Sequence, residues 1–138
     1  MHLVHITPEM LGNVWDQVKP GLERIQRKTQ EPWKLDDIFT ALLAGRADLY
    51  IPVHKKHYGG FIITHPMVEP WSQRKILHIW CAYTLHSAVR DETIKTIAEI
   101  AKKAGYTALE FRSPRKGWEK RAATLGFKVK ETTYQRLL

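Results

Sequence analysis

The sequence has almost no cysteine and no long hydrophobic run. Cys81 is the single cysteine in 138 residues, which excludes an intramolecular disulfide and a cysteine-based zinc cluster. No apolar run approaches the ~18 residues that a membrane span needs, and residues 1–5 lack the apolar core of a signal peptide. We therefore expect a cytoplasmic protein with no membrane partner.

Acidic residues are also scarce compared with basic ones. There are 14 Asp and Glu against 22 Lys and Arg, giving a formal net charge of +8. This excess favours an anionic partner, such as a phosphate-rich cofactor, an acidic macromolecule or nucleic acid, although it also fits solubility alone. No recognition helix or RNA-binding signature accompanies the charge, so a nucleic acid is the least favoured of these partners.

What the chain does have is ordinary globular composition and strong periodicity. The length and the 43% hydrophobic content predict a single domain over residues 1–138. Helical spacing of apolar residues covers 11–25, 35–43, 87–104 and 118–125, and we expect Pro20 to break or kink the first of these helices. Strand patterns cover residues 2–6, 48–53, 59–64, 75–83, 106–111 and 127–133, with a loop at 66–72.

The order of these elements predicts the fold class. We expect an α/β domain with a mixed central sheet of six or seven strands and helices on both faces, in the order β-α-α-β-β-β-α-β-α-β. The three middle strands should form an antiparallel meander. Residues 75–111 should form a right-handed parallel crossover, and strand 75–83, apolar on both sides, should be central.

Three segments of this outline resemble the GNAT acyltransferase superfamily. They are residues 42–51, residues 75–103, and residues 117–127 with their ending Leu125-Gly126-Phe127. The resemblance implies an N-acyltransferase that transfers an acetyl group from acetyl-CoA to an amine acceptor, either a small molecule or a protein. It also implies that acetyl-CoA binds where the strands at 75–83 and 107–111 splay apart.

The resemblance places the cofactor against one strand-to-helix junction. Backbone groups there would bind the pantetheine arm and the pyrophosphate, because the first N–H groups of a helix lack internal partners and favour an anion. The residues that this implies are Tyr83, Thr84, Leu85, Ser87, Ala88, Val89 and Arg90. The sequence departs from the family here, since the segment has no glycine.

Catalytic candidates follow from the chemistry that amine acetylation needs. His78, in the central strand, can titrate near neutrality and so could act as a base; the alternative is a hydrogen-bonded histidine of the sheet. His65 and Glu69 flank the loop before this strand and could face an acceptor. Tyr134 could donate a proton to the departing thiolate, because the position where many family members carry a tyrosine is Ala122 here; otherwise its ring simply packs.

The remaining residues suggest no metal. His2 with His5, and His54 with His57, lack a third ligand at a recognisable spacing, so we expect no metal cofactor. Because the glycines and the helix tyrosine are missing, the alternative function is a catalytically degenerate GNAT-like binding or structural module. Small proteins of this outline are also found among tailed bacteriophages, some as virion components.

Overall fold

The structure is a computed structural model that describes residues 1–138. Its strands are β1 (His2–Ile6), β2 (Asp48–His54), β3 (His57–Tyr58), β4 (Gly60–Val68), β5 (Lys75–Thr84) and β6 (Ala108–Phe111). Its helices are the 3-10 turn η1 (Pro8–Met10), α1 (Leu11–Thr29), α2 (Leu35–Leu43), α3 (Ser87–Lys103) and α4 (Trp118–Thr124).

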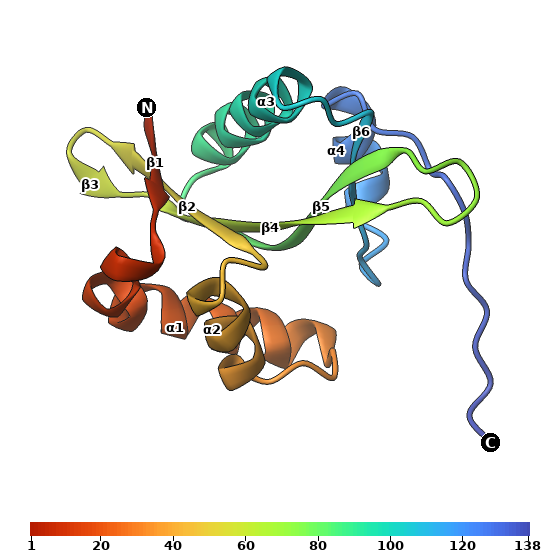
Figure 1. Ribbon diagram of the computed structural model, residues 1–138, viewed down its shortest axis with the longest axis horizontal. Coiled ribbons are helices and arrows are strands. Elements are labelled where there is room, and N and C mark those ends of the chain that lie inside the picture. Colours follow the sequence, from red (N-terminus) through yellow and green to blue (C-terminus); the bar gives the residue numbers. More distant parts are fainter.

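The six strands form one mixed sheet. Its order is β1-β2-β4-β5-β6, with the short β3 paired to β2. Strands β2, β4 and β5 are antiparallel, whereas β5 and β6 are parallel and joined by α3, so the predicted meander and the predicted parallel crossover are both confirmed. Helices α1 and α2 cover one face and α3 covers the other (Figure 1).

Each face of the sheet buries its own hydrophobic cluster. On the face of α1 and α2, helix residues such as Val18, Leu22 and Ile38 pack against strand residues such as Phe61 and Ile63. On the α3 face, the cluster consists of Ile62, Leu77, Ile79, Ile97 and Ala101. Alternation along the strands separates the two clusters, because successive side chains point to opposite faces.

Strand β5 carries a β-bulge at Trp80. Ile63 of β4 pairs with Cys81 and Thr64 pairs with Ile79, so Trp80 is an extra residue in β5. Both Trp80 and Cys81 therefore pack toward α1 and α2. A bulge of this kind bends its strand and increases the local twist, and here it changes the direction of β5 in the middle of the sheet.

Helix α1 continues through Pro20 without the predicted break. It runs from Leu11 to Thr29, and Pro20 lies inside it. Val18 and Leu22, on either side of the proline, are fully buried and fix both halves of the helix against the sheet. Pro20 and Asp16 are exposed, so the carbonyl that loses its hydrogen bond at Asp16 can be hydrated.

The predicted last strand is absent. Residues 127–138 have no regular secondary structure and leave the domain as an extended tail, so β6 is the edge of the sheet (Figure 1). Phe127 packs on Phe111, with ring centroids 5.0 Å apart. The alternating pattern of residues 127–133 was not enough to make them pair as a strand. The neighbouring β6 has only four residues, and the tail carries charges at Lys128, Lys130 and Glu131.

Two other predicted boundaries shift. The loop expected to begin at Pro66 begins after Val68, because Pro66 pairs with Leu77 and prolongs β4. The strand expected from residue 106 begins at Ala108.

Gly21 gives a test of how tightly α1 packs on the sheet. A Cβ at Gly21 would lie 2.6 Å from Phe61 Cε1 and 3.0 Å from Tyr83 Cδ1, whereas a Cβ at Gly12 would meet nothing within 4 Å. Both glycines are in α1. We expect Gly21→Ala to lower the free energy of unfolding by about 1–3 kcal/mol through overpacking. Gly12→Ala should raise it by about 0.5–1 kcal/mol, as measured by chemical denaturation; a stabilised Gly21→Ala would contradict the packing.

Candidate functional site

An open slot separates the ends of β5 and β6. The two strands pair from Ile76 with Ala108 to Ile79 with Phe111, and no further pairs follow. Beyond this point β5 continues to Thr84, still paired with β4, whereas the chain leaves β6 after Phe111. A cavity of about 420 Å³ lies between them, and it is lined by residues 79–85, by residues 111–115 and by parts of α1, α3 and α4.

The local sequence explains why the slot opens here. The bulge at Trp80 directly follows the last β5–β6 pair, and beyond it β5 stays paired with β4 up to the pair of Thr84 with Gly60. Gly60 has a φ of +126°, and a Cβ there would lie 2.0 Å from the Tyr83 carbonyl oxygen, so only glycine fits this close approach. On the other side, Pro114 follows β6 and lines the cavity.

The charged residues that line the slot are mainly positive. Its basic residues are Arg24, Lys28, Arg112 and Arg115, and its single acidic residue is Glu31. The Arg24 guanidinium donates a hydrogen bond to the Tyr83 hydroxyl (3.3 Å) and lies over the Tyr83 ring. A cavity with this excess of cations favours an anionic ligand.

The start of α3 borders the same cavity. Thr84 and Leu85 line the slot, Ser87 and Ala88 are exposed, and Val89 is buried. The Arg90 N–H donates to the His86 carbonyl (3.1 Å), so the N–H groups before it lie in the first turn, where a helix offers no internal acceptors. The Leu85 N–H is already used, because it donates to the Gly59 carbonyl (3.0 Å).

Arg90 is fixed beside this helix start. Its guanidinium lies over the Trp118 ring, 5.6 Å from the centroid, and its Nε donates to the Asp91 carboxylate (3.1 Å). Its Nη2 is buried without a hydrogen-bond partner. Of the predicted cofactor residues, Tyr83, Thr84 and Leu85 line the slot, whereas Ser87, Ala88, Val89 and Arg90 do not. Arg90 adjoins the slot through Trp118, which lines it.

His78 is buried beside the slot, on the face of α1 and α2. The side chain is only 6% exposed, its ring lies 4.9 Å from the ring of His65, and its Nδ1 has no hydrogen-bond partner. Burial, together with the nearby His65 and Arg112, lowers the pKa of His78 to about 4. The imidazole is therefore neutral near pH 7, so it is available as an acceptor and not as a cation.

The other predicted chemical groups lie elsewhere. Tyr134 is 91% exposed in the tail and does not line the slot. Ala122 is in α4 and does not line it either. Cys81 lines the slot, but burial raises the pKa of its thiol and keeps it protonated.

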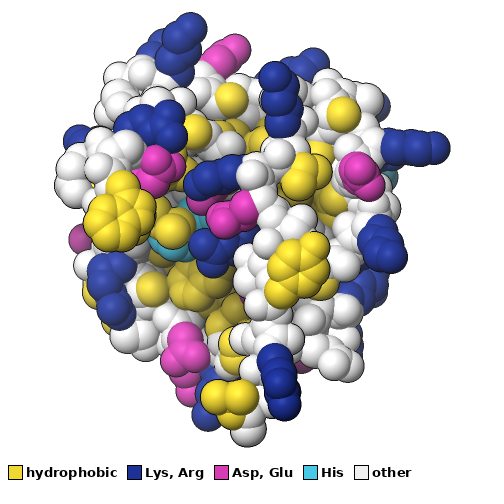
Figure 2. All heavy atoms as spheres, turned by 90° about the vertical axis from the view of Figure 1, so that its right-hand side faces the viewer, with side chains coloured by type: hydrophobic (Ala, Val, Ile, Leu, Met, Phe, Trp, Pro, Cys, Tyr) yellow, Lys and Arg dark blue, Asp and Glu magenta, His cyan; other side chains and the backbone are white.

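The sequence analysis named His65 and His78 separately but missed Glu110 and the polar row that the three residues form across the sheet. His65 of β4, His78 of β5 and Glu110 of β6 are cross-strand neighbours on the face of α1 and α2. Lys130 Nζ lies 3.4 Å from Glu110 Oε2 and 3.6 Å from Glu69 Oε2. Figure 2 shows this end of the molecule, where histidine, acidic and basic side chains meet at a hollow with hydrophobic walls. No sequence signal joins positions 65, 78 and 110, because the pairing of strands brings them together.

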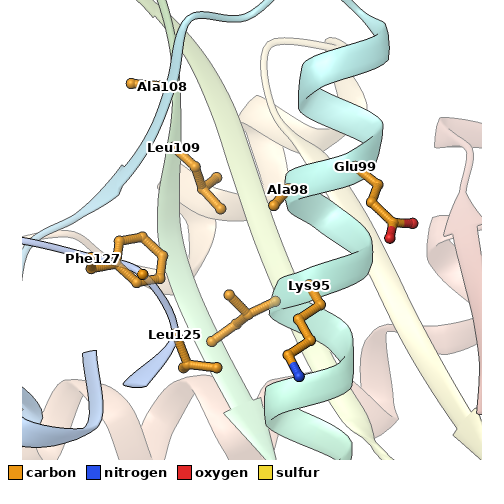
Figure 3. Close-up of a pocket in the computed structure, with 9 residues that line it drawn as sticks. Lys95, Ala98, Glu99, Ala108, Leu109, Leu125 and Phe127 are labelled. Carbon is orange, nitrogen blue, oxygen red and sulfur yellow. The ribbon is translucent and has the colours of Figure 1, made fainter. Parts of the chain in front are cut away.

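A second cavity, of about 520 Å³, lies on the opposite face of the sheet. It is formed by α3, by β6 and by the chain after α4 (Figure 3). Ala98, Leu109, Leu125 and Phe127 make it largely apolar, with Lys95 and Glu99 among its lining residues. Its lining has no hydroxyl group, whereas Tyr83, Thr84 and Ser113 line the slot, so the slot is the stronger candidate for a reaction site.

No three His, Cys, Asp or Glu side chains are placed to hold a metal ion together. None of the helices combines the length and apolar character that would let it cross a membrane.

The sheet order, the bulged central strand and the slot between parallel strands define the GNAT acetyltransferase fold. Solved structures of acetyltransferases share it over the whole chain. A probable acetyltransferase aligns with a TM-score of 0.74 at 13% identity, covering 100% of this chain and 97% of that one. A ribosomal-protein-alanine N-acetyltransferase from Brucella melitensis aligns at 0.73 and 15% identity, covering 100% of both chains.

An aminoglycoside acetyltransferase from an uncultured soil metagenomic sample, solved in complex with sisomicin, also shares the fold. Its TM-score is 0.73 at 8% identity, with 99% of this chain and 94% of that one covered. No family model and no curated protein sequence matches this chain.

The pKa of His78 predicts a specific acid sensitivity. Because it is about 4 in the folded protein and 6.5 ordinarily, the unfolded chain binds the proton more tightly. Stability is unaffected above pH 6.5 and falls as the pH drops toward 4, by about 2–3 kcal/mol at pH 4.5. The test is the difference in free energy of unfolding between pH 7 and pH 4.5.

Between pH 7 and pH 4.5, the loss in free energy of unfolding should be about 2–3 kcal/mol smaller for His78→Gln than for the unmodified protein. His57→Gln, at an exposed turn position, controls for the loss of a histidine. Equal pH dependence in the His78→Gln variant and the unmodified protein would contradict the assignment.

Proposed function

We propose that this protein is an N-acetyltransferase that moves an acetyl group from acetyl-CoA to an amine. The observation that carries the proposal is the open 420 Å³ slot between β5 and β6, which leads to the start of α3. Parallel strands that separate at their carboxyl ends, followed by a helix N-terminus, offer a place for an extended ligand that ends in phosphates. The acetyltransferases among the solved structures that share the fold support the same reaction class.

The chemistry of the lining residues suits acetyl-CoA. Its phosphates would lie near the first turn of α3, with Arg90 and Arg115 as the cationic groups on that side. The pantetheine arm would occupy the slot along residues 79–84, and the Thr84 to Val89 junction would take the role that the glycine-rich loop has in the family. Ser87 and Ala88 are small and exposed, so the backbone there is accessible without glycine.

The transfer itself requires one exchange of bonds and two proton transfers. The amine nitrogen attacks the thioester carbonyl, a C–N bond forms and the C–S bond breaks; the amine loses a proton and the CoA thiolate gains one. His78, neutral near pH 7, would accept a hydrogen bond from the attacking amine, and the proton would pass on to solvent. The hydroxyl of Tyr83, which lines the slot, is the phenol placed to protonate the thiolate.

A variant that fills the slot tests cofactor binding. Ala82 is exposed and lines the slot, so Ala82→Phe should weaken acetyl-CoA binding at least tenfold in isothermal titration, because the benzyl group occupies ligand space. Ala123→Phe, at an exposed position of α4 outside the slot, is the matched control and should bind normally. Absence of heat from the unmodified protein at millimolar acetyl-CoA would overturn the proposal.

A comparison of two phenols tests the proton donor. We expect Tyr83→Phe to lower kcat by about 10²-fold, the lower end of general-acid effects, while the acetyl-CoA affinity changes little. Tyr134→Phe should leave kcat unchanged, because that side chain is almost fully exposed in the tail. A lowered kcat for Tyr134→Phe with an unchanged kcat for Tyr83→Phe would instead identify Tyr134 as the proton donor. Turnover is followed through the released CoA thiol.

The competing function is a GNAT-like binding module without acetyl transfer. The alanine at Ala122 and the glycine-free junction at 84–90 favour it. If it is correct, CoA should not raise the melting temperature, because only a ligand that binds the native state stabilises it. A rise in melting temperature without turnover would indicate a CoA-binding protein that has lost transfer.

A further inference from the structure

We propose that Glu110 and Glu69 form a binding site for a primary ammonium group, and that Lys130 of the chain's own tail occupies this site. As an acceptor site it rests on the proposed function, since it would present the amine that receives the acetyl group. The site predicts that the acceptor is a primary amine on a flexible aliphatic stem, such as a lysine side chain.

The two carboxylates converge from separate parts of the fold. Lys130 Nζ is 3.4 Å from Glu110 Oε2 and 3.6 Å from Glu69 Oε2. Glu69 is fixed in advance, because Ser72 donates to it (2.6 Å) and Arg74 donates to both of its oxygens (3.0 and 3.3 Å). These contacts also lower the pKa of Glu69, with the Ser72 hydrogen bond as the largest cause, so the carboxylate is charged near neutral pH. Glu110 makes its only side-chain hydrogen bond to Lys130.

A second, independent observation points to a ligand at the same place. His78 is the cross-strand neighbour of Glu110, so the two side chains lie on the same face of the sheet. Its Nδ1 is buried and has no hydrogen-bond partner. An amine held by Glu110 would therefore lie on the same face as this imidazole, whose free nitrogen could accept a hydrogen bond from it.

The site also adjoins the end of the slot. Phe111, the residue after Glu110, lines the slot, and so does Trp80, whose ring contacts the ring of His65. The acetyl group at the tip of a cofactor in the slot would thus meet an amine in the polar row. The charge at Glu110 suits a cation, because Arg74 pairs with Glu69 alone and Glu110 has no cationic partner other than Lys130.

Lys130 is held weakly enough to be replaced. Its side chain is 55% exposed, and ion pairs at that exposure contribute little to stability. The tail around it has no regular secondary structure, so its displacement breaks no strand or helix. The lysine behaves as an internal competitor that mimics the substrate ammonium.

The first experiment measures amine binding without acetyl-CoA. The probe is Nα-acetyl-lysine methylamide, whose only charge is the side-chain ammonium, and the control probe is the norleucine analogue, which lacks that nitrogen. Binding is followed by amide chemical shifts of the protein. We expect Lys130→Gln to bind the lysine probe about two- to fivefold more tightly than the unmodified protein, since the competing pair is lost. Lys128→Gln, an exposed lysine of the same tail, should not change the affinity.

The second experiment uses the acetylation assay with the same probe. Lys130→Gln should lower the KM for the amine with kcat unchanged, and Glu110→Gln should raise that KM at least fivefold. A merely structural role for Lys130 would lower the melting temperature and leave the amine KM unchanged. That result, or equal binding of the norleucine analogue, would overturn the proposal.

Each of the two proposals can be disproved by its own experiment. Acetyl-CoA titration without amine tests the acetyltransferase proposal alone, and the amine titration without acetyl-CoA tests the ammonium site alone. If Glu110→Gln unfolds the protein, the comparison of Lys130→Gln with Lys128→Gln still decides the question, because both changes lie in the tail outside the core.

Discussion

The short parallel ladder between β5 and β6 is the constraint on which the candidate site depends. It ends after the pair Ile79 and Phe111, and the bulge at Trp80 follows at once on β5. Strand β5 is held on its other edge by β4 up to Thr84, so it cannot follow β6. The backbone there is left with an open side, which proteins rarely tolerate unless water or a ligand satisfies it. The slot, the basic lining and the exposed start of α3 all follow from that separation.

The same bulge also changes which face of the sheet the side chains of β5 point to. Before it, alternation sends Leu77 and Ile79 to the α3 face and His78 to the face of α1 and α2. After it, Cys81 points to the face of α1 and α2. The row of His65, His78 and Glu110 thus lies beside the slot but outside both hydrophobic clusters. Under the proposed function, cofactor and acceptor would approach each other there from different directions, which direct transfer requires.

Much of the fold could be predicted from the sequence because its periodicity is strong. The meander, the crossover through α3 and the central position of β5 depend on apolar patterns that span many residues, and all were found. The failures have local causes. Pro20 did not break α1 because buried residues on both sides fix the helix, and residues 127–133 alternate like a strand but do not pair with β6. The prediction of the cofactor residues came from the resemblance, whereas Glu110, Lys130 and Arg24 had no pattern that could reveal them.

By itself, the sequence determined the element order, the two-faced core and the excess of positive charge, because each depends on residue type and spacing along one chain. Only the tertiary structure decided where the sheet opens and which charged groups meet. A bulge depends on the register between two strands, and an ion pair such as Lys130 with Glu110 joins residues 20 positions apart. Both depend on distances in space that spacing along the chain does not specify.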